Sequence, residues 1–442
     1  MNETICALAT PIGTGGISII RISGEKSLEI AKQFFSCSSI DYENIKPRYL
    51  YFGNFNGKDF IDQVLFVYFK APFSFTGEDV VEFQFHGGEY LASKILKELL
   101  TKCRLSEPGE FTKRAFLNGK ISLDEAQAVS DLIFAESDAE IKSANLLQKG
   151  FLNKKIKSVQ EDILNLLAEI EANLDYPDDF SENVLIEKSK TLAKNIKEKI
   201  EEILTNSENS KQIKNGINVA IVGKTNVGKS SLLNAILGEN RAIVTDIEGT
   251  TRDVISERVL IDGYKVNFID TAGIRESEDV VEKIGIKKSL EEIDNADLVL
   301  FVLDLSREIE KDEFEVYEKI KNKPHIVVAN KCDNKKININ FEKFIEISAK
   351  NDINIEKLKK EIIKTIISEK IDYSKIMLTN ERQISILKNC LNLICEFLNK
   401  TLSLDLIAFE IKNIWKELGK ITGDTEDEKI IDTIFSKFCL GK

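Results

Sequence analysis

The chain has 442 residues, 43% of them hydrophobic and 30% charged, so it is long enough for two or three domains that each bury a core. Its formal net charge of −12 at pH 7 argues against blanket electrostatic binding to nucleic acid, without excluding a local basic surface. No apolar run approaches the length of a membrane span and the first residues lack the pattern of a signal peptide, so we expect a cytoplasmic protein without a membrane segment.

The first part of the chain, residues 1–118, is expected to form a β-rich domain with few helices. The Asn56-Gly57 pair predicts a two-residue type I′ hairpin turn, and the continuous apolar run Phe60–Phe69 predicts a strand in the interior of a sheet. Tyr90–Leu100 is the clearest helix of this part. The expected strands are Thr4–Ala9, Gly16–Ile22, Tyr49–Phe55, Phe60–Phe69 and Val80–His86.

After Ser122 the apolar residues recur with a helical period. Each of two helical blocks leaves an apolar stripe that needs a partner, so we interpret 119–212 and 373–442 as the halves of one helical domain that flank an inserted domain, 213–372. Two separate helical regions are the alternative. The expected helices are Asp124–Gly150, Phe151–Leu174, Ser181–Leu204, Glu381–Lys400, Leu404–Leu418 and Glu426–Phe438.

The inserted domain is organised around a phosphate-binding loop. Ile217–Val222 predicts a buried strand, and the letters G-K-T-N-V-G-K-S that follow fit G-x-x-x-x-G-K-[ST] ahead of a helical stretch, Ser231–Leu237. The two glycines let backbone N–H groups converge on a phosphate next to a helix N-terminus. Lys229 would reach the β- and γ-phosphates, and Ser230 would ligate Mg²⁺.

Two later motifs fit the parts of such a site that respond to the γ-phosphate. Gly249-Thr250-Thr251-Arg252-Asp253 carries a threonine hydroxyl that would close over the phosphate and give Mg²⁺ a second ligand. Asp270-Thr271-Ala272-Gly273 follows an expected strand, Tyr264–Ile269, that begins after an Asp262-Gly263 hairpin turn. Asp270 would hold the Mg²⁺ water shell, and Gly273 would offer its N–H to the γ-phosphate.

The base is indicated by N-K-C-D, which runs from Asn330 to Asp333 after a buried strand. A carboxylate at Asp333 accepts from both the ring N–H and the exocyclic amine of guanine, a donor pair that adenine lacks. Ser348-Ala349-Lys350 follows the expected strand Phe344–Ile347 and fits a loop that offers a backbone N–H to the guanine carbonyl. Five motifs in one order predict a GTPase, and an ATPase is the weaker alternative.

The residue after Gly273 indicates that the hydrolytic water is not positioned as it is in Ras-type GTPases. Ile274 follows Gly273, where Ras-type GTPases carry a water-orienting Gln, and an apolar side chain cannot do that work. Asn226, inside the phosphate loop, is a neutral oxygen donor for a monovalent cation, and Glu282 is a carboxylate within reach. The alternative for both Asn226 and Glu282 is an ordinary solvated surface residue.

The whole chain, residues 1–442, resembles the MnmE (TrmE) family of tRNA uridine-modification GTPases. The motifs that carry the resemblance are A-T-P-I-G-T-G-G near the start, S-F-T-G-E-D at 74–79, H-G-G at 86–88, P-G-E-F-T-K-R-A-F-L-N-G-K at 108–120, the GTPase motifs and the terminal Cys439-Leu440-Gly441-Lys442. The resemblance implies a multidomain protein with a β-rich folate-binding N-terminal domain, a helical domain and an inserted Ras-like P-loop GTPase domain with a mostly parallel sheet.

The resemblance also implies an activity and its partners. It implies a homodimer that joins an FAD-dependent partner, MnmG, in a heterotetramer and uses a 5-formyl-tetrahydrofolate-type cofactor. Together they would install an aminomethyl or carboxymethylaminomethyl group on C5 of the wobble uridine of certain tRNAs. GTP is the substrate of the GTPase domain, with Mg²⁺ and K⁺ as its ions.

Residue roles carry over from the family at matching positions. The K⁺ ligands are expected to be Asn226, Thr245, Ile247 and Thr250, the Mg²⁺ ligands Ser230 and Thr251, and the folate contacts Arg21, Glu78, Lys120 and Lys442. The catalytic candidates are Glu282, which would orient the hydrolytic water, Lys229, Asp270 and Cys439. The expected GTP-binding residues are Asn226, Val227, Gly228, Lys229, Ser230, Ser231, Thr245, Asp246, Ile247, Glu248, Gly249, Thr250, Thr251, Asp270, Thr271, Ala272, Gly273, Asn330, Lys331, Asp333, Ser348, Ala349 and Lys350.

Several alternatives stay open. Without the resemblance, Arg21 and Lys120 could be either solvated basic residues or partners for a glutamyl carboxylate. Cys439 is either a nucleophile, if its pKa is lowered, or an inert thiol. For the whole chain, a ribosome-assembly GTPase of the Era or Der type is the main alternative, and a dynamin-like membrane GTPase is a third.

Overall fold

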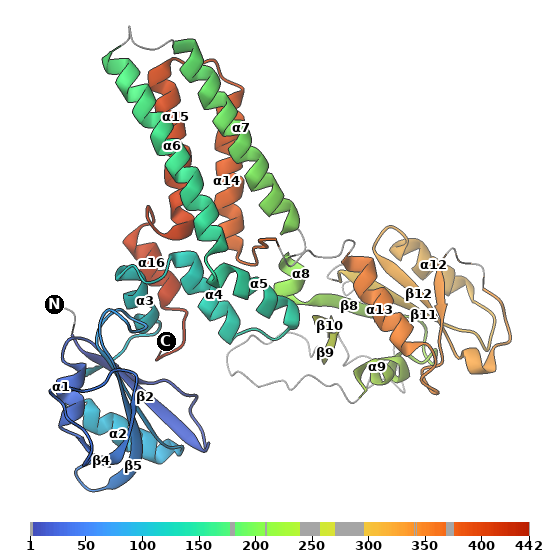
Figure 1. Ribbon diagram of the computed structural model, residues 1–442. Helices are drawn as coiled ribbons and strands as arrows, with labels where there is room; N and C mark the ends of the chain where they lie inside the picture. Colours follow the sequence, from blue (N-terminus) through green and yellow to red (C-terminus); the bar gives the residue numbers. More distant parts are fainter. Residues whose placement is uncertain are drawn as a thin grey trace. The chain divides into compact units, whose positions relative to one another are not determined.

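The computed structural model describes residues 3–176, 182–207, 210–238, 257–269, 296–339, 341, 343–367 and 375–441. The chain forms two compact units, whose segments can be followed by colour in Figure 1. The first unit comprises Met1–Ser130, Leu146–Ile196 and Asn389–Lys442, and the second comprises Asp131–Asn145 and Lys197–Lys388. The domain boundaries expected from the sequence stay predictions.

The N-terminal part of the first unit is built on a mixed sheet. Its described strands lie in the order β3-β4-β5-β6-β2-β1-β7, and all pairs are antiparallel except the parallel pair of β1 and β7. The helices α1 and α2 contribute Ile30, Ala31, Ala92, Ile95 and Leu99 to the core on one face of this sheet. The elements are β1 Ile5–Leu8, β2 Ile17–Ser23, α1 Ser27–Lys32, β3 Phe35–Ser36, β4 Leu50–Asn56, β5 Ile61–Phe69, β6 Val80–His86, α2 Glu89–Leu99 and β7 Arg104–Leu105.

The β4–β5 hairpin confirms one prediction and corrects another. The strand β5 pairs with β4 on one side and β6 on the other, so it lies in the interior of the sheet as expected. The turn is not the predicted two-residue type I′ turn, because Asn56 still pairs with Ile61 and the Gly57 N–H bonds to the Phe60 carbonyl at 2.9 Å. The Phe60 ring stacks on that of Phe55 at 6.1 Å, and this packing draws Phe60 into a longer loop.

The helical part of the first unit is held together by facing apolar stripes. The helices α6 and α15 pack along one another, and the α6 residues Ile156, Ile163 and Ile170 are buried at helical spacing (Figure 1). Lys188 on α7 pairs with Glu169 on α6 at 2.7 Å. The helices of this part and its neighbours are α3 Glu110–Leu117, α4 Leu123–Ile133, α5 Asp138–Gln148, α6 Phe151–Asp175, α7 Glu182–Asn206, α14 Glu381–Leu398, α15 Leu404–Thr422 and α16 Glu428–Phe435.

One helix expected to be continuous, Asp124–Gly150, is divided into α4 and α5. Ser137 begins the second helix, since its hydroxyl accepts from the Glu140 N–H at 3.3 Å while the Glu140 carboxylate accepts from the Glu136 N–H at 2.6 Å. These contacts resemble a capping box, whose sequence signature Ser-x-x-Glu is present at 137–140. The break between α4 and α5 could therefore have been predicted from the sequence.

The second unit is an α/β layer structure. Within the described part of the chain, its strands form a sheet in the order β13-β12-β11-β8-β10-β9, parallel except for the antiparallel β9–β10 hairpin. Apolar residues of α9 and α13 pack on one face and those of α12 on the other. The elements are α8 Ser210–Asn215, β8 Ile217–Val222, α9 Lys229–Leu237, β9 Glu257–Ile261, β10 Tyr264–Phe268, β11 Leu298–Asp304, α12 Lys311–Ile320, β12 His325–Asn330, the 3₁₀ turn Cys332–Asn334, β13 Phe344–Glu346 and α13 Ile355–Ile366.

The expected fold class is confirmed: a β-rich N-terminal domain, a helical domain, and a mostly parallel sheet with a strand–loop–helix at β8–α9. The predicted Asp262-Gly263 turn is confirmed too, because both residues have positive φ values of 49° and 80°. Over the residues described, no helix is long and apolar enough to cross a membrane.

Candidate functional site

The phosphate loop is shaped by close backbone packing at its two glycines. Gly228, with φ +96°, precedes the first turn of α9, and a β-carbon there would overlap the Asn330 side-chain amide. A β-carbon at Gly223 would overlap the Val302 carbonyl oxygen. Val227 is fully buried and anchors the loop between them. Both positions therefore require glycine for steric reasons. With glycine there, the loop backbone can turn tightly just before the N-terminus of α9.

The structure describes the charged and hydroxyl side chains of the loop. Lys229 donates from Nζ to the carbonyl oxygens of Gly223 at 2.6 Å and Lys224 at 2.7 Å, so its ammonium lies over the loop. Ser230 is exposed in the first turn of α9. Asn226 is exposed and left-handed, with φ 64°. This cradle of backbone and ammonium groups suits a phosphate chain.

The guanine motifs are joined to the loop by direct hydrogen bonds. The Asn330 amide donates from Nδ2 to the Val227 carbonyl at 2.8 Å and accepts at Oδ1 from the Ala349 N–H at 3.1 Å. Lys331 donates from Nζ to the Asn226 carbonyl at 2.9 Å. Three motifs that are far apart in the sequence therefore meet at the carboxyl ends of β8 and β12.

Asp304, at the end of β11, is a member of this site that the sequence reasoning missed. Its carboxylate lies 2.6 Å from Lys331 Nζ and accepts from the Ser306 N–H and hydroxyl. Burial alone would raise the pKa of Asp304, but the hydrogen bonds from Lys331 and Ser306 outweigh it and lower the pKa from its ordinary value. The available signal was an acid at the end of a fully apolar strand.

The remaining guanine-site candidates are exposed or lie beside the joined motifs. Asp333 is exposed in the 3₁₀ turn that follows β12, and Lys350 is exposed after the buried Ser348. Ser231 is exposed at the start of α9. The predicted site residues that lie outside the described part of the chain are Thr245, Asp246, Ile247, Glu248, Gly249, Thr250, Thr251, Asp270, Thr271, Ala272, Gly273, Glu282 and Lys442.

Three predicted folate contacts lie around the end of β2 and the loop before β6. Arg21 on β2 donates from Nε to the Glu82 carboxylate at 2.7 Å, and its guanidinium lies 5.8 Å from the centre of the Phe111 ring. Glu78 accepts at Oε2 from the hydroxyl of Ser23, two residues beyond Arg21 on the same face of β2.

The third contact reaches the same loop from the end of α3. Lys120 donates from Nζ to the Pro72 carbonyl at 2.9 Å, and its aliphatic stem lies beside Gly77. The side chains present, two cations and one carboxylate, suit a ligand that carries carboxylates at one end and N–H donors at the other.

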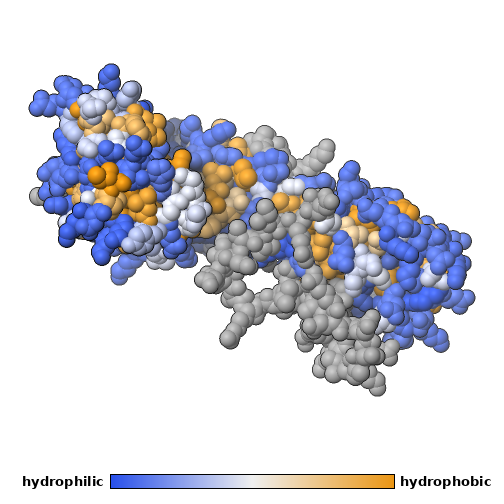
Figure 2. Space-filling model, turned by 90° about the horizontal axis from the view of Figure 1, so that it is seen from below, coloured by the Kyte–Doolittle hydropathy of each residue, from blue (hydrophilic) through white to orange (hydrophobic). Residues whose placement is uncertain are grey.

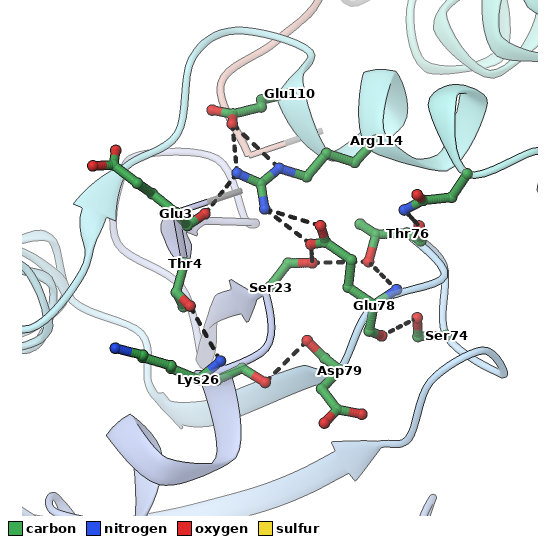
Figure 3. A network of polar contacts seen from close by, with 12 residues as sticks. Glu3, Thr4, Ser23, Lys26, Ser74, Thr76, Glu78, Asp79, Glu110 and Arg114 are labelled. Carbon is green, nitrogen blue, oxygen red and sulfur yellow. Dashed lines mark hydrogen bonds and ion pairs between the residues drawn. The ribbon is translucent and has the colours of Figure 1, made fainter. Parts of the chain in front are cut away.

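A buried ionic network supports this loop from α3, and the sequence reasoning missed it (Figure 3). Arg114 donates to the Glu78 carboxylate at 2.9 Å and to the Glu110 carboxylate at 2.8 Å. Arg104 donates to the other side of Glu110 at 2.6 Å. The three residues Arg104, Glu110 and Arg114 read in the sequence as ordinary surface charges, and only the fold shows that they are joined.

The C-terminal tail is fixed against the N-terminal part of the same unit. The Gly109 N–H donates to the Cys439 carbonyl at 3.2 Å, and Phe438 packs in a cluster with Phe435 and Leu123. Gly441, with φ +85°, approaches the Leu8 carbonyl so closely that a β-carbon would overlap it. Cys439 is half-buried at this position.

Two of the predicted ion ligands lie on the phosphate loop. Ser230 and Asn226, one predicted ligand each for Mg²⁺ and K⁺, are described, whereas Thr251, Thr245, Ile247 and Thr250 are outside the described residues. Over the described ranges no group of three or more His, Cys, Asp and Glu side chains is placed to hold a metal ion.

Comparisons with known proteins cover both units. The family model "GTP-binding protein TrmE N-terminus" matches residues 4–120, and the model "MnmE helical domain" matches residues 123–439. The chain is 43% identical to "tRNA modification GTPase MnmE" of Clostridioides difficile (strain 630) and 40% identical to the protein of the same name of Aquifex aeolicus (strain VF5). Both alignments cover 100% of this chain and 100% of the relative.

Similar solved structures match a smaller share of the chain. An Era variant of Aquifex aeolicus bound to GDP and aluminium fluoride is 28% identical and covers 42% of this chain and 69% of its own, with a TM-score of 0.27. The G domain of the T. maritima FeoB iron transporter is 22% identical and covers 34% of this chain and 98% of its own, with a TM-score of 0.26. Family models over both units and full-length relatives above 30% identity agree, so the chain belongs to the MnmE (TrmE) family of tRNA modification GTPases.

Proposed function

We propose that the protein hydrolyses GTP as part of the modification of the wobble uridine of certain tRNAs. The observation that carries this proposal is the joining of the phosphate loop to the guanine motif by Asn330 and Lys331, in a chain that is similar over its full length to proteins named tRNA modification GTPase MnmE. The full-length similarity includes the N-terminal and helical parts, so the Era-type alternative is not favoured.

The guanine preference is tested at Asp333. The carboxylate would accept from the two guanine donors that adenine lacks. We expect Asp333→Asn to lower the preference for GTP over xanthosine triphosphate, because xanthine carries a carbonyl where guanine carries the amine and an amide side chain can donate to it. The measurement is the turnover of GTP, ATP and xanthosine triphosphate by both proteins. Equal base preference before and after the change would contradict the role of Asp333.

The ion and water roles rest on positions in the phosphate loop and on the family pattern. Asn226 would contribute a side-chain oxygen to K⁺ together with Thr245, Ile247 and Thr250, while Ser230 and Thr251 would ligate Mg²⁺. The K⁺ would supply positive charge at the phosphates when bound. Glu282 would orient the hydrolytic water, a role that Ile274 cannot take; Lys229 and Asp270 would hold the phosphates and the Mg²⁺ water shell.

The ion role has a direct test. We expect GTP turnover by the wild-type protein to be faster in K⁺ than in Na⁺, and we expect Asn226→Ala to lose that difference. Asn234→Ala, on α9 outside the loop, is the matched control and should keep it. Equal rates in K⁺ and Na⁺ for the wild-type protein would remove the assigned roles of Asn226 and the loop residues.

The folate role is supported by the charges around the loop before β6. Arg21, Lys120 and Lys442 would hold the glutamyl carboxylates, and Glu78 would accept from N–H groups of the 5-formyl-tetrahydrofolate-type cofactor, which would supply a one-carbon unit. The test is calorimetry with 5-formyltetrahydrofolate on the wild-type protein and on Arg21→Ala. Undetectable binding to the wild-type protein at millimolar ligand would contradict this part of the proposal.

Homodimerisation is supported by apolar side chains on the open face of the N-terminal sheet. Leu50 and Phe52 on β4 and Ile61 on β5 are 51%, 62% and 71% exposed, and Figure 2 shows orange hydrophobic patches among the hydrophilic surface of this part. Exposed apolar patches on a folded domain mark interaction sites. We expect Phe52→Asp to convert a dimer to a monomer in light-scattering measurements. A monomeric wild-type protein would contradict the proposal.

The remaining partners follow from the family. MnmG would join the homodimer in a heterotetramer on tRNA, in the cytoplasm. A catalytic part for Cys439 stays a prediction, which Cys439→Ser tests: modified tRNA should be lost while GTP turnover is kept.

A further inference from the structure

Arg114 is surrounded by protein, and every nitrogen of its guanidinium makes a hydrogen bond. Its residue is 4% exposed. Nη2 donates to the Glu3 carbonyl and to the Glu110 carboxylate, both at 2.8 Å, and Nε donates to Glu110 at 3.2 Å. Nη1 donates to both oxygens of Glu78, at 3.2 and 2.9 Å. The guanidinium is therefore a rigid plate between two carboxylates (Figure 3).

Glu110 holds this plate in place from the side away from Glu78. It also accepts from Arg104 at 2.8 and 2.6 Å and from the Glu107 N–H at 2.8 Å. Burial alone would raise the pKa of Glu110, but the hydrogen bonds from Arg104, Glu107 and Arg114 lower it to about 2. Glu110 is therefore ionised at neutral pH and is shared between Arg104 and Arg114.

The backbone around Glu78 is fixed independently of Arg114. The Glu78 N–H donates to the Thr76 hydroxyl at 3.2 Å, and the Glu78 carbonyl accepts from the Ser74 hydroxyl. The next residue, Asp79, accepts at its carbonyl from the Ser27 hydroxyl at 2.9 Å. With the main chain held in this way, the direction of the Glu78 side chain depends on Arg114 and on Ser23.

One lone pair of the Glu78 carboxylate accepts no hydrogen bond from any described residue. Oε2 accepts from Ser23 at 2.8 Å and from Arg114 at 2.9 Å, which occupies both of its lone pairs. Oε1 accepts only the 3.2 Å bond from Arg114 among the described residues. One lone pair of Oε1 therefore remains for an N–H donor of a ligand.

We propose that Arg114 is a positioning residue of the folate site, which aims Glu78 Oε1 at an N–H group on the ring of the cofactor. This inference rests on the proposed folate binding and adds a residue to it. Arg114 acts through Glu78 and makes no contact with the ligand. The ligand group selected by Glu78 is a ring with N–H donors, whereas the cations Arg21 and Lys120 select carboxylates.

The experiment is a double-mutant cycle on the full-length protein with 5-formyltetrahydrofolate as the titrant. We expect Glu78→Ala to weaken binding by about tenfold or more, since each factor of ten corresponds to about 1.4 kcal/mol and a charge-assisted hydrogen bond is worth that much. Arg114→Met should weaken it by a similar factor. The double variant should bind no more weakly than Glu78→Ala alone, because Arg114 has no route to the ligand except Glu78.

Two further variants separate positioning from folding. Arg114→Lys keeps a cation but not the planar fork, so it should bind with an intermediate affinity. Lys113→Met removes the neighbouring cation of α3, which pairs with Asp432 at 2.6 Å, and should leave folate affinity unchanged. GTP turnover and melting temperature are recorded for each variant, and only variants that keep GTP turnover enter the cycle.

A second titrant locates the effect on the ligand. Tetrahydrobiopterin carries a reduced ring without the glutamyl carboxylates, so Arg114→Met should weaken its binding as much as that of the folate. Arg21→Ala should weaken folate binding only.

The outcomes are distinguishable. If the wild-type protein does not bind the folate, or if Glu78→Ala binds it normally, the proposed folate site fails and this inference with it. If Glu78→Ala binds weakly while Arg114→Met and Arg114→Lys bind normally, the positioning role alone is overturned. Losses that add in the double variant would overturn it as well.

Discussion

Lys331 Nζ lies 2.9 Å from the carbonyl oxygen of Asn226 and 2.6 Å from the carboxylate of Asp304. One side chain thus braces the phosphate loop against the end of β11. Asn226 has a left-handed backbone with φ 64°, which asparagine adopts more readily than most non-glycine residues, and Lys331 holds its carbonyl in this conformation.

We expect Lys331→Met to weaken GTP binding by about tenfold and to destabilise the second unit by about 2–3 kcal/mol, because it leaves Asp304 buried without its cation. Adding Asp304→Asn should recover stability but not GTP affinity. The measurements are GTP titration and urea unfolding. Lys335→Met, which breaks the more exposed pair with Glu346 at 2.6 Å, is the control. Equal effects of the two lysine changes would contradict the brace.

Gly441 gives a prediction about the C-terminal tail. We expect Gly441→Ala to displace the tail, because φ +85° and the nearby Leu8 carbonyl both exclude a β-carbon. The half-buried Cys439 should then react several-fold faster with a thiol reagent, as followed by mass spectrometry of its peptide. Gly119→Ala is the matched control, since it has φ +67° but open space around it. Unchanged labelling of Cys439 would show that the contact with Leu8 does not hold the tail.

Asp124 predicts a pH-dependent stability change. The residue is fully buried on α4, its Oδ1 accepts from the Ser122 hydroxyl, and its Oδ2 has no hydrogen-bond partner among the described residues. Burial raises its pKa from 3.8 to about 6. Because the folded pKa lies above the unfolded one, the ionised form destabilises the fold. This penalty is absent below about pH 4, grows as the pH rises through 6 and is complete above it.

We therefore expect Asp124→Asn to stabilise the protein by about 1–3 kcal/mol at pH 8 and to have little effect at pH 4. Urea unfolding at the two pH values measures the difference. The exposed Asp162→Asn on α6 should change stability by less than about 0.5 kcal/mol at either pH. A gain that is the same at pH 4 and pH 8 would show that ionisation of Asp124 is not its cause.

Lys265 on β10 gives a prediction within the second unit. Its ammonium pairs with Glu140 on α5 at 2.7 Å and with Glu136 at 3.2 Å, and it donates to the Lys214 carbonyl at 2.7 Å. Lys265→Met should loosen α5 from the β9–β10 hairpin, with hydrogen exchange in 138–148 faster by about tenfold or more. Lys359→Met, which breaks a pair with the exposed Glu356 within α13, is the control. Unchanged exchange in α5 would contradict this role of Lys265.

The hairpin matters for function because of its place in the chain. Its two ends continue toward the predicted nucleotide residues Thr251 and Asp270. A slower GTP turnover in K⁺ for Lys265→Met, with unchanged GTP affinity, would indicate that the α5 contact influences the catalytic step.

The phosphate loop could be predicted from the sequence because its shape depends on local backbone requirements at Gly223 and Gly228. The same holds for the Asp262-Gly263 turn. The Asn56-Gly57 turn was predicted wrongly, since Phe60, just after the turn, packs on Phe55, just before it, and the loop between the strands is longer. Ring packing across the loop therefore outweighed the preference of the Asn-Gly pair.

The buried ionic residues could not be predicted, for a related reason. An isolated Arg or Asp is normally exposed, and nothing beside Arg114 or Asp304 in the sequence names its partner. Their partners, Glu78 and Lys331, come from other elements, so the pairing depends on which strand and helix ends meet. The helix break at Ser137 is different. Its capping signature is present in the sequence, but the predicted continuous helix rested on the apolar period alone.

The contacts of Gly441 with Leu8 and of Cys439 with Gly109 order the events of biosynthesis. The strand β1 is synthesised well before residues 438–441, so the surface that the tail covers stays uncovered until those residues have been made. The tail then closes over it only when translation has passed both units.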